Sequence, residues 1–168
     1  TFRIFPTISL NTGNFDIAAE NFWWDYGLNI EEIYFGNGIL RKQEFEEIIR
    51  WTPNLKVIKL ERNSLFKTWQ IKGTYHERVC QFENCYHISL ANNSFINRKI
   101  FDYMVSKAPN LREIDLSGCL TKMSGRERTQ ILDHFIFYLK GYGATIKLIN
   151  IHSTIVDDFF LQQLAEVS

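Results

Sequence analysis

Apolar residues along this chain follow two patterns that alternate, a short one and a helical one. The stretch LREIDLSGC at 111–119 shows the short pattern, with Leu111, Ile114 and Leu116 followed by Cys119. A plain strand alternates every second residue, and a helix repeats about every 3.6 residues, so neither alone has this spacing. We interpret the stretch as a short strand with its apolar residues on one side, followed by a turn.

The short pattern recurs along the chain. Clear copies are LKVIKLERN at 55–63 and CYHISLANN at 85–93, and weaker copies begin at residues 5, 30 and 146. Successive copies are separated by 25, 25, 30, 26 and 35 residues, and the longer steps indicate insertions within 64–84 and 120–145. A strand template that returns at a nearly constant interval is typical of a repeat protein, whose units bury their apolar faces against one another.

Helical periodicity fills the intervals between these strands. In RKQEFEEIIRW, for example, Phe45, Ile48 and Ile49 fall on one face of a helix. Ser124 and Glu127 have the spacing of a capping box at the start of another predicted helix. The stripes predict helices that pack on the strands, over residues 14–24, 41–51, 97–108, 125–141 and 154–167.

The template L-x-x-L-x-L-x-x-N/C with a period of roughly 20–29 residues is that of leucine-rich repeats. We therefore predict an α/β fold, a leucine-rich-repeat horseshoe (a solenoid) of about six strand–helix repeats, with parallel strands on the concave side and helices outside. Residues 1–168 form a single domain on this interpretation. Because the chain opens TFRIFPTISL without Met, we interpret it as a fragment of a longer protein.

The template also predicts which residues are buried. The apolar template residues Leu60, Leu90, Ile114 and Leu116 are expected to be fully buried. Asn93 and Cys119 occupy the ninth position, and we expect them to be buried in the turn after a strand. There a short polar side chain can satisfy backbone groups that the turn leaves unpaired.

Composition excludes several classes of protein. Lys plus Arg and Asp plus Glu number 19 each, so the net charge is zero and neither a nucleic-acid nor an anionic-membrane partner is expected. No apolar run approaches the roughly 18 residues of a membrane span. Three cysteines are an odd number, which favours a reducing compartment, cytoplasmic or nuclear, over a disulfide scaffold.

Motifs of catalysis and of cofactor binding are not found in the sequence, which has no G-x-S-x-G, H-E-x-x-H, Walker or G-x-G-x-x-G pattern. We expect no enzyme activity, catalytic residue or cofactor. Cys80 and Cys85 with His76 and His87 leave a zinc site open, but the spacing is loose and buried thiols are the favoured interpretation. His134 is expected on the surface of a helix.

The variable positions of the strands would face the hollow of the horseshoe, where solenoids commonly bind partners. We predict that this face carries more negative than positive charge, because Lys59 is the only Lys or Arg among these positions. A basic segment of a protein partner would therefore suit it, and the alternative is an ordinary solvated sheet face. The predicted protein-binding residues are Glu32, Tyr34, Lys59, Glu61, His87, Ser89, Glu113, Asp115, Asn150 and His152.

WTPNLKVIKLERN and KAPNLREIDLSGC resemble the repeats of F-box/leucine-rich-repeat proteins, which follow C-P-N-L-x-x-L-x-L-x-x-C. Thr52 and Ala108 stand where that family has Cys, and the F-box is absent from the chain. The resemblance implies the substrate-recognition domain of an SCF-type ubiquitin ligase receptor. A Skp-type adaptor would then bind through the missing N-terminal F-box, and other subunits would carry the catalysis.

Other classes stay open beside this one. KAPNLREIDLSG also resembles the repeat domain of nuclear RNA export factors, which would need a basic surface for RNA. A structural subunit of a stable assembly, such as a mitochondrial one, would use the repeats only for packing. An inhibitor of the ribonuclease-inhibitor type would have longer and more regular repeats.

Overall fold

The structure, a computed structural model, describes residues 7–10, 25–36, 42–61, 82–93, 96–121, 123–142, 145–154 and 156–167. The strands are β1 (Thr7–Leu10), β2 (Glu32–Gly36), β3 (Val57–Glu61), β4 (His87–Ser89), β5 (Glu113–Asp115) and β6 (Leu148–Asn150). The described helices are α2 (Lys42–Trp51), α3 (Arg98–Ser106), α4 (Gly125–Tyr142), α5 (Asp158–Val167) and the short 3₁₀ helix η2 (Gly27–Asn29). The helix expected over 14–24 lies largely outside the described residues.

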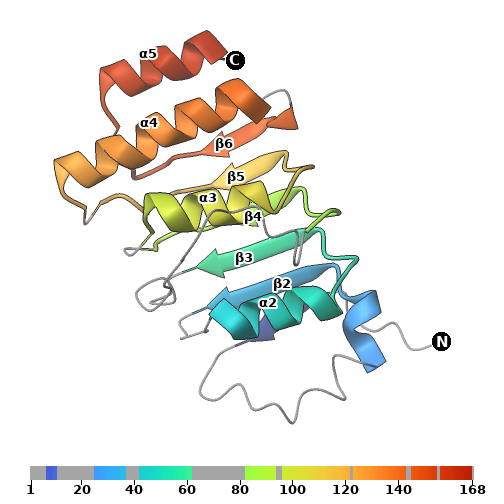
Figure 1. The fold of residues 1–168 in the computed structure, drawn as a ribbon. Helices are drawn as coiled ribbons and strands as arrows, with labels where there is room; N and C mark the ends of the chain where they lie inside the picture. The colour runs from blue at the N-terminus through green and yellow to red at the C-terminus, as the bar shows by residue number, and fades with distance from the viewer. Residues whose placement is uncertain are drawn as a thin grey trace.

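The strands form one sheet in the order of the chain, β1 to β6, and every neighbouring pair is parallel (Figure 1). The middle apolar position of the sequence template is in register from β2 to β6, where it is occupied by Ile33, Ile58, Ile88, Ile114 and Ile149. The predicted α/β architecture with parallel strands is therefore confirmed, and each strand contributes the same positions to the same face.

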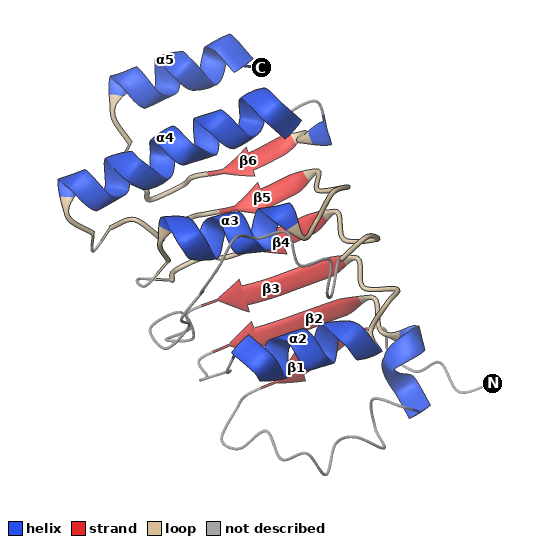
Figure 2. Cartoon of the chain, viewed as in Figure 1, coloured by secondary structure: helices blue, strands red, loops and turns tan. Residues whose placement is uncertain are grey.

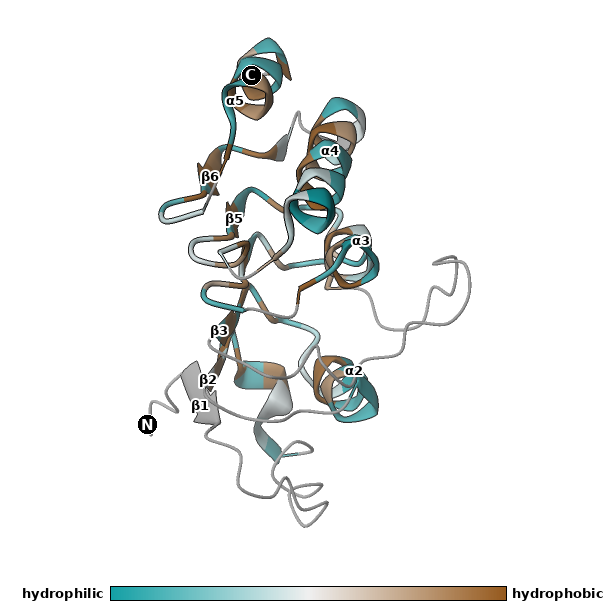
Figure 3. Cartoon of the chain, turned by 90° about the vertical axis from the view of Figure 1, so that its left-hand side faces the viewer, coloured by the Kyte–Doolittle hydropathy of each residue, from teal (hydrophilic) through white to brown (hydrophobic). Residues whose placement is uncertain are grey.

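Helices α2 to α5 all lie on one side of the sheet (Figures 2 and 3). A parallel pair needs a crossover connection, and α2, α3 and α4 lie in the crossovers that lead to β3, β5 and β6. Strand side chains that point toward the helices are apolar, as the buried Ile58 and Leu60 of β3 illustrate. The alternate side chains of each strand point to the opposite face, which the described helices leave uncovered.

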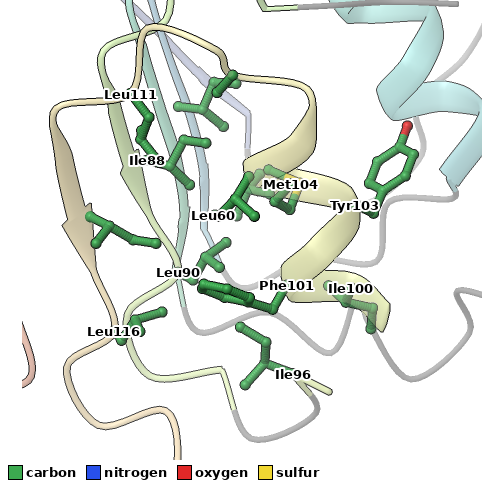
Figure 4. Packing of buried hydrophobic residues seen from close by; sticks show 14 of the residues in the cluster. Leu60, Ile88, Leu90, Ile96, Ile100, Phe101, Tyr103, Met104, Leu111 and Leu116 are labelled. Atoms are coloured by element: carbon green, nitrogen blue, oxygen red, sulfur yellow. The ribbon is translucent and has the colours of Figure 1, made fainter. Parts of the chain in front are cut away.

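The core lies between the sheet and the helices. Leu60 and Leu90 are 0% exposed, and Ile114 and Leu116 are 1% exposed, so the predicted burial of these four residues is confirmed. In Figure 4 the strand leucines meet α3, which contributes residues such as Phe101. A T-shaped contact of 5.4 Å between the ring centres of Phe101 and Phe135 extends the core from α3 to α4.

Ninth-position residues join each turn to the preceding strand. Asn93 Nδ2 donates to the carbonyl oxygen of Leu60, and Cys119 Sγ donates to that of Leu90 at 2.7 Å. Both residues are 0% exposed, so the prediction that they are buried turn residues is confirmed. Burial raises the pKa of the Cys119 thiol to about 12, which keeps it protonated and able to donate.

His134 departs from its predicted place on the surface. Its side chain is only 17% exposed, and Nε2 pairs with Oδ1 of Asp102, so the two residues connect α4 to α3. Burial raises the pKa of Asp102, while the positive charges of His134 and Arg98 oppose this shift. The prediction was wrong because it considered one helix alone, and α3 packs against the face on which His134 lies.

The predicted capping box at the start of α4 is present. Ser124 Oγ accepts from the backbone N–H of Glu127 at 3.4 Å, and Glu127 Oε2 accepts from the N–H of Ser124 at 3.2 Å. Ser124 Oγ also donates to Glu127 Oε2 at 2.7 Å, and this bond together with the one from the Ser124 N–H lowers the pKa of Glu127. The helix consequently begins at Gly125, as the spacing indicated.

Candidate protein-binding surface

Strand register arranges the predicted binding positions in rows on the sheet face opposite the helices. One row runs through Glu32, Val57, His87, Glu113 and Leu148. The next runs through Tyr34, Lys59, Ser89, Asp115 and Asn150. Glu61 lies one step beyond in β3, and His152 follows β6. The structure thus brings together residues that are far apart in the sequence.

Two ion pairs occupy the N-terminal part of this surface. Lys59 Nζ lies 2.5 Å from Glu32 Oε1, and Lys56 Nζ lies 2.6 Å from Glu31 Oε1. All four side chains are between 28% and 46% exposed, so each pair contributes at most about 1 kcal/mol to stability. Their main effect is on charge, because each acid has a cation beside it.

Tyr34 presents the aromatic ring of this surface. It lies next to Gly36, where an added Cβ would come within 2.6 Å of the Tyr34 ring. The glycine therefore leaves room for the ring to lie along the strand. This close approach holds a large, partly exposed aromatic side chain in a defined place, which suits a contact with another protein.

Hydrogen bonds between neighbouring strands engage the central predicted residues. His87 Nδ1 lies 2.8 Å from Glu113 Oε2, and Ser89 Oγ donates to Glu61 Oε1 at 3.1 Å. Ser89 is only 1% exposed, so it supports Glu61 and offers no contact area to a partner. Sequence alternation does not reveal this burial, because the neighbouring side chains that cover Ser89 come from other strands.

Asp115 and Asn150 make equivalent hydrogen bonds at the ends of successive strands, β5 and β6. Asp115 Oδ1 accepts from the backbone N–H of Ser117 at 2.8 Å, and Asn150 Oδ1 accepts from that of His152 at 3.0 Å. Each side chain closes the turn that follows its strand. His152 Nδ1 in turn lies 2.9 Å from Ser153 Oγ.

The acids predicted for this surface have different partners, and within the described residues Glu32 alone among them has a cation of fixed charge beside it. Glu32 has Lys59 as an ion-pair partner, and Glu113 has His87 as a hydrogen-bond partner. Asp115 is engaged by a backbone N–H. The structure pairs the one cation counted on this face, Lys59, with Glu32, and the remaining counted acids make hydrogen bonds to neutral donors or to His87.

An open hollow of about 750 Å³ lies beside this surface, and the sequence interpretation missed it. Its lining residues come from the segments just before β2, β3 and β4, namely Leu28, Asn29, Glu31, Asn54, Lys56, Asn84 and Tyr86. A repeated Asn directly before the first apolar residue of the template, as in PNL and ENC, is the signal that could have revealed it.

This repeated Asn joins neighbouring units by side-chain hydrogen bonds to backbone. Asn54 Nδ2 donates to the carbonyl oxygen of Leu28 at 2.8 Å, and Asn84 Nδ2 donates to that of Pro53 at 2.9 Å. Asn110 makes the same bond one unit further on, to Glu83 at 2.7 Å. The three amides form a ladder along the edge of the sheet where the strands begin.

Cys85, a member of the candidate zinc set, is a buried thiol after α2 and β3, just before β4. Its thiol is buried, donates to the carbonyl oxygen of His87 at 3.3 Å, and has a pKa raised by burial to about 12. Cys80 and His76 lie outside the described residues. Among the residues that are described, no group of three or more His, Cys, Asp or Glu side chains is placed to hold a metal ion.

No protein-family model matches the chain, and no curated protein matches it significantly. The likeness to F-box/leucine-rich-repeat proteins thus rests on the PNL motifs alone. None of the helices in the described part of the chain is long and apolar enough to span a bilayer.

Proposed function

We propose that residues 1–168 form a leucine-rich-repeat horseshoe of about six units that binds a protein on its concave sheet face. The observation that supports this proposal is that alternate residues of a strand have different roles. Residues such as Ile58 and Leu60 form the core at 0% exposure, whereas Lys59 between them faces outward and contributes nothing to that core. The strands lie side by side in one sheet, so the outward-facing side chains of neighbouring strands form one broad surface.

Chemical variety on the surface suits recognition of a protein. Tyr34 supplies an aromatic contact of the type often found at the centre of interfaces. The ion pair of Glu32 with Lys59 and the hydrogen bond of His87 with Glu113 supply polar groups that can exchange partners on binding. Exposed aromatic and polar groups of this kind support binding as the function of the surface.

The partner class follows from the sequence motifs. We propose that the domain is the recognition part of an SCF-type ubiquitin ligase receptor, with a Skp-type adaptor bound through an F-box upstream of Thr1. Such a protein would act in the cytoplasm or nucleus. The free, buried thiols of Cys85 and Cys119 suit a reducing compartment of that kind.

A structural subunit of a stable assembly is the second candidate. It is favoured by apolar side chains exposed on the last unit, where Leu148 is 56%, Phe159 62% and Leu161 45% exposed. Exposed apolar side chains that lie close together often mark a contact with another protein. In this alternative the covering protein would be another subunit, and the concave face would have no role in recognition.

Affinity purification of the full-length protein distinguishes the two candidates. For a receptor, a Skp-type adaptor co-purifies, and a second partner is lost on Tyr34→Ala or on charge reversal at Glu113 and Asp115 while the adaptor stays bound. Phe159→Ala is the matched control, because it removes an exposed ring from α5 and should leave the second partner bound. Loss of the partner with Phe159→Ala but not with Tyr34→Ala would instead favour the structural subunit.

A further inference from the structure

The residues that directly precede the strands form a row of their own. Backbone hydrogen bonds place Tyr86 next to Lys56, Arg112 next to Tyr86, and Lys147 next to Arg112. The bond from Arg112 N to Tyr86 O is 2.8 Å, and that from Lys147 N to Arg112 O is 2.7 Å. We refer to Tyr86, Arg112 and Lys147 as the rim; all three side chains are exposed.

The two cations of the rim have no acidic partner in the part of the chain that the structure describes. Lys56 and Lys59, in the neighbouring unit, each pair with a glutamate. Arg112 and Lys147 make no ion pair or side-chain hydrogen bond within the described residues. The rim is therefore the part of this surface where free cations gather, and an anionic group of a partner would be attracted there.

The hollow adjoins the rim at Tyr86, which belongs to the rim and also lines the hollow. Tyr86 is 37% exposed. Asn54 and Asn84 each use Nδ2 for the ladder described above, and this bond fixes the orientation of the amide. Their Oδ1 atoms accept no hydrogen bond from the described residues. Along successive units the surface therefore presents two oriented amide oxygens, then an aromatic ring, and then two cations.

We propose that the hollow and the rim bind an extended, acidic segment of a protein partner, rich in Asp and Glu. Main-chain N–H groups of the segment donate to the Asn54 and Asn84 oxygens, its apolar atoms contact Tyr86, and its carboxylates pair with Arg112 and Lys147. This inference rests on the proposed protein-binding function and names the partner's chemistry. It departs from the expectation of a basic segment, because among the described residues the two rim cations have no acidic partner, whereas the cation of the sheet face, Lys59, is paired with Glu32.

Charge decides between a protein and a nucleic acid as the ligand. Proteins that bind a duplex tightly contact roughly 6–10 phosphates. The rim offers two cations that have no ion-pair partner among the described residues, which is fewer than such a phosphate footprint needs. A short carboxylate segment needs only the two cations, so an acidic peptide fits the surface better than an oligonucleotide does.

Selection from a random peptide library tests the proposal without a known ligand. Peptides of about twelve residues are displayed on phage and selected on the immobilised chain at about 0.1 M salt. We expect the enriched peptides to be rich in Asp and Glu. One winner is then synthesised with a fluorescent label, and its affinity for the protein is measured by anisotropy.

Paired charge reversals then locate the site. Arg112→Glu with Lys147→Glu should weaken the labelled peptide by about tenfold or more, since two attractive contacts become repulsive. Arg126→Glu with Lys99→Glu is the control: it also reverses one Arg and one Lys, both exposed and both in the first turn of a helix on the opposite side. The control should leave the affinity unchanged, and higher salt should weaken only the wild-type and control complexes appreciably.

Several outcomes would overturn the inference. Winners rich in Lys and Arg that depend on Glu113 or Asp115 would refute the acidic segment and leave the proposed function standing. An equal loss of affinity in both double variants would refute the rim as the site. A labelled single-stranded oligonucleotide that binds more tightly than the selected peptide would show that the ligand is a nucleic acid. Failure to enrich any peptide would count against the proposed function as well.

Discussion

Replacement of Asn93 tests how neighbouring units are held together. Its side chain is 0% exposed, and Nδ2 donates to the carbonyl oxygens of both Leu60 and Leu90. In Asn93→Ala the buried Leu60 oxygen loses its side-chain donor, at a cost of about 1–3 kcal/mol, and the bond to Leu90 adds about 0.5–1.5 kcal/mol. We expect the free energy of unfolding to fall by about 2–4 kcal/mol.

Two comparison variants separate the hydrogen bonds from loss of volume. Cys119→Ala removes a weaker donor from the Leu90 oxygen, which keeps its bond from Asn93, so a loss of only about 1 kcal/mol is expected. Asn93→Asp keeps the shape, but an ionised carboxylate has no donor to offer the two carbonyl oxygens. At neutral pH it should therefore destabilise the protein more than Asn93→Ala does.

The aspartate variant also makes a pH prediction with a defined sign. Burial near two carbonyl oxygens raises the pKa of the new carboxyl group in the folded state above that in the unfolded state. Its contribution to stability is then present below the unfolded-state pKa and is lost as pH rises through the folded-state pKa. The deficit of Asn93→Asp relative to wild type should accordingly shrink on acidification, which Asn93→Ala should not show.

Urea unfolding followed by circular dichroism measures these effects, with all variants compared at neutral and at mildly acidic pH. The reasoning would be refuted if Asn93→Ala were no less stable than Cys119→Ala. It would also be refuted if the deficit of Asn93→Asp were independent of pH. Either result would mean that the buried carbonyl oxygens do not need the donors that the structure assigns to them.

Three further predictions concern the core, the thiols and the turns. Leu116→Ala should cost about 2–5 kcal/mol and destabilise the flanking units too, and an unmoved melting midpoint would contradict this. Cys85 and Cys119, with pKa values of about 12, should resist iodoacetamide at pH 8 until urea is added, as mass spectrometry of the two peptides would show. Gly118→Ala should destabilise by about 1–2 kcal/mol, because Gly118 has φ +67° and an added Cβ would lie 2.5 Å from Asn92 Oδ1. Gly125→Ala, with no atom within 4 Å, should be neutral or stabilising in the same urea titration.

Local spacing in the sequence determined the order and direction of the elements. The template places Leu111, Ile114 and Leu116 on one side of a short strand, and the same spacing recurs in each unit. Only a parallel, in-register sheet lets every unit bury these positions against the same helical layer. The burial of Asn93 and Cys119 follows from the same template, because the ninth position always reaches back to the strand before it.

Only the tertiary structure decided how charge is distributed on the surface. Lys59 and Glu32 are 27 residues apart, and His87 and Glu113 are 26 apart, so each pair exists only because the units stack. Stacking also buries Ser89, and it leaves Arg112 and Lys147 without an ion-pair partner among the described residues. The apolar pattern is complete within each unit, so it can be recognised from the sequence alone. Charge compensation depends on side chains of neighbouring units, and their relative positions are fixed only when the sheet has formed.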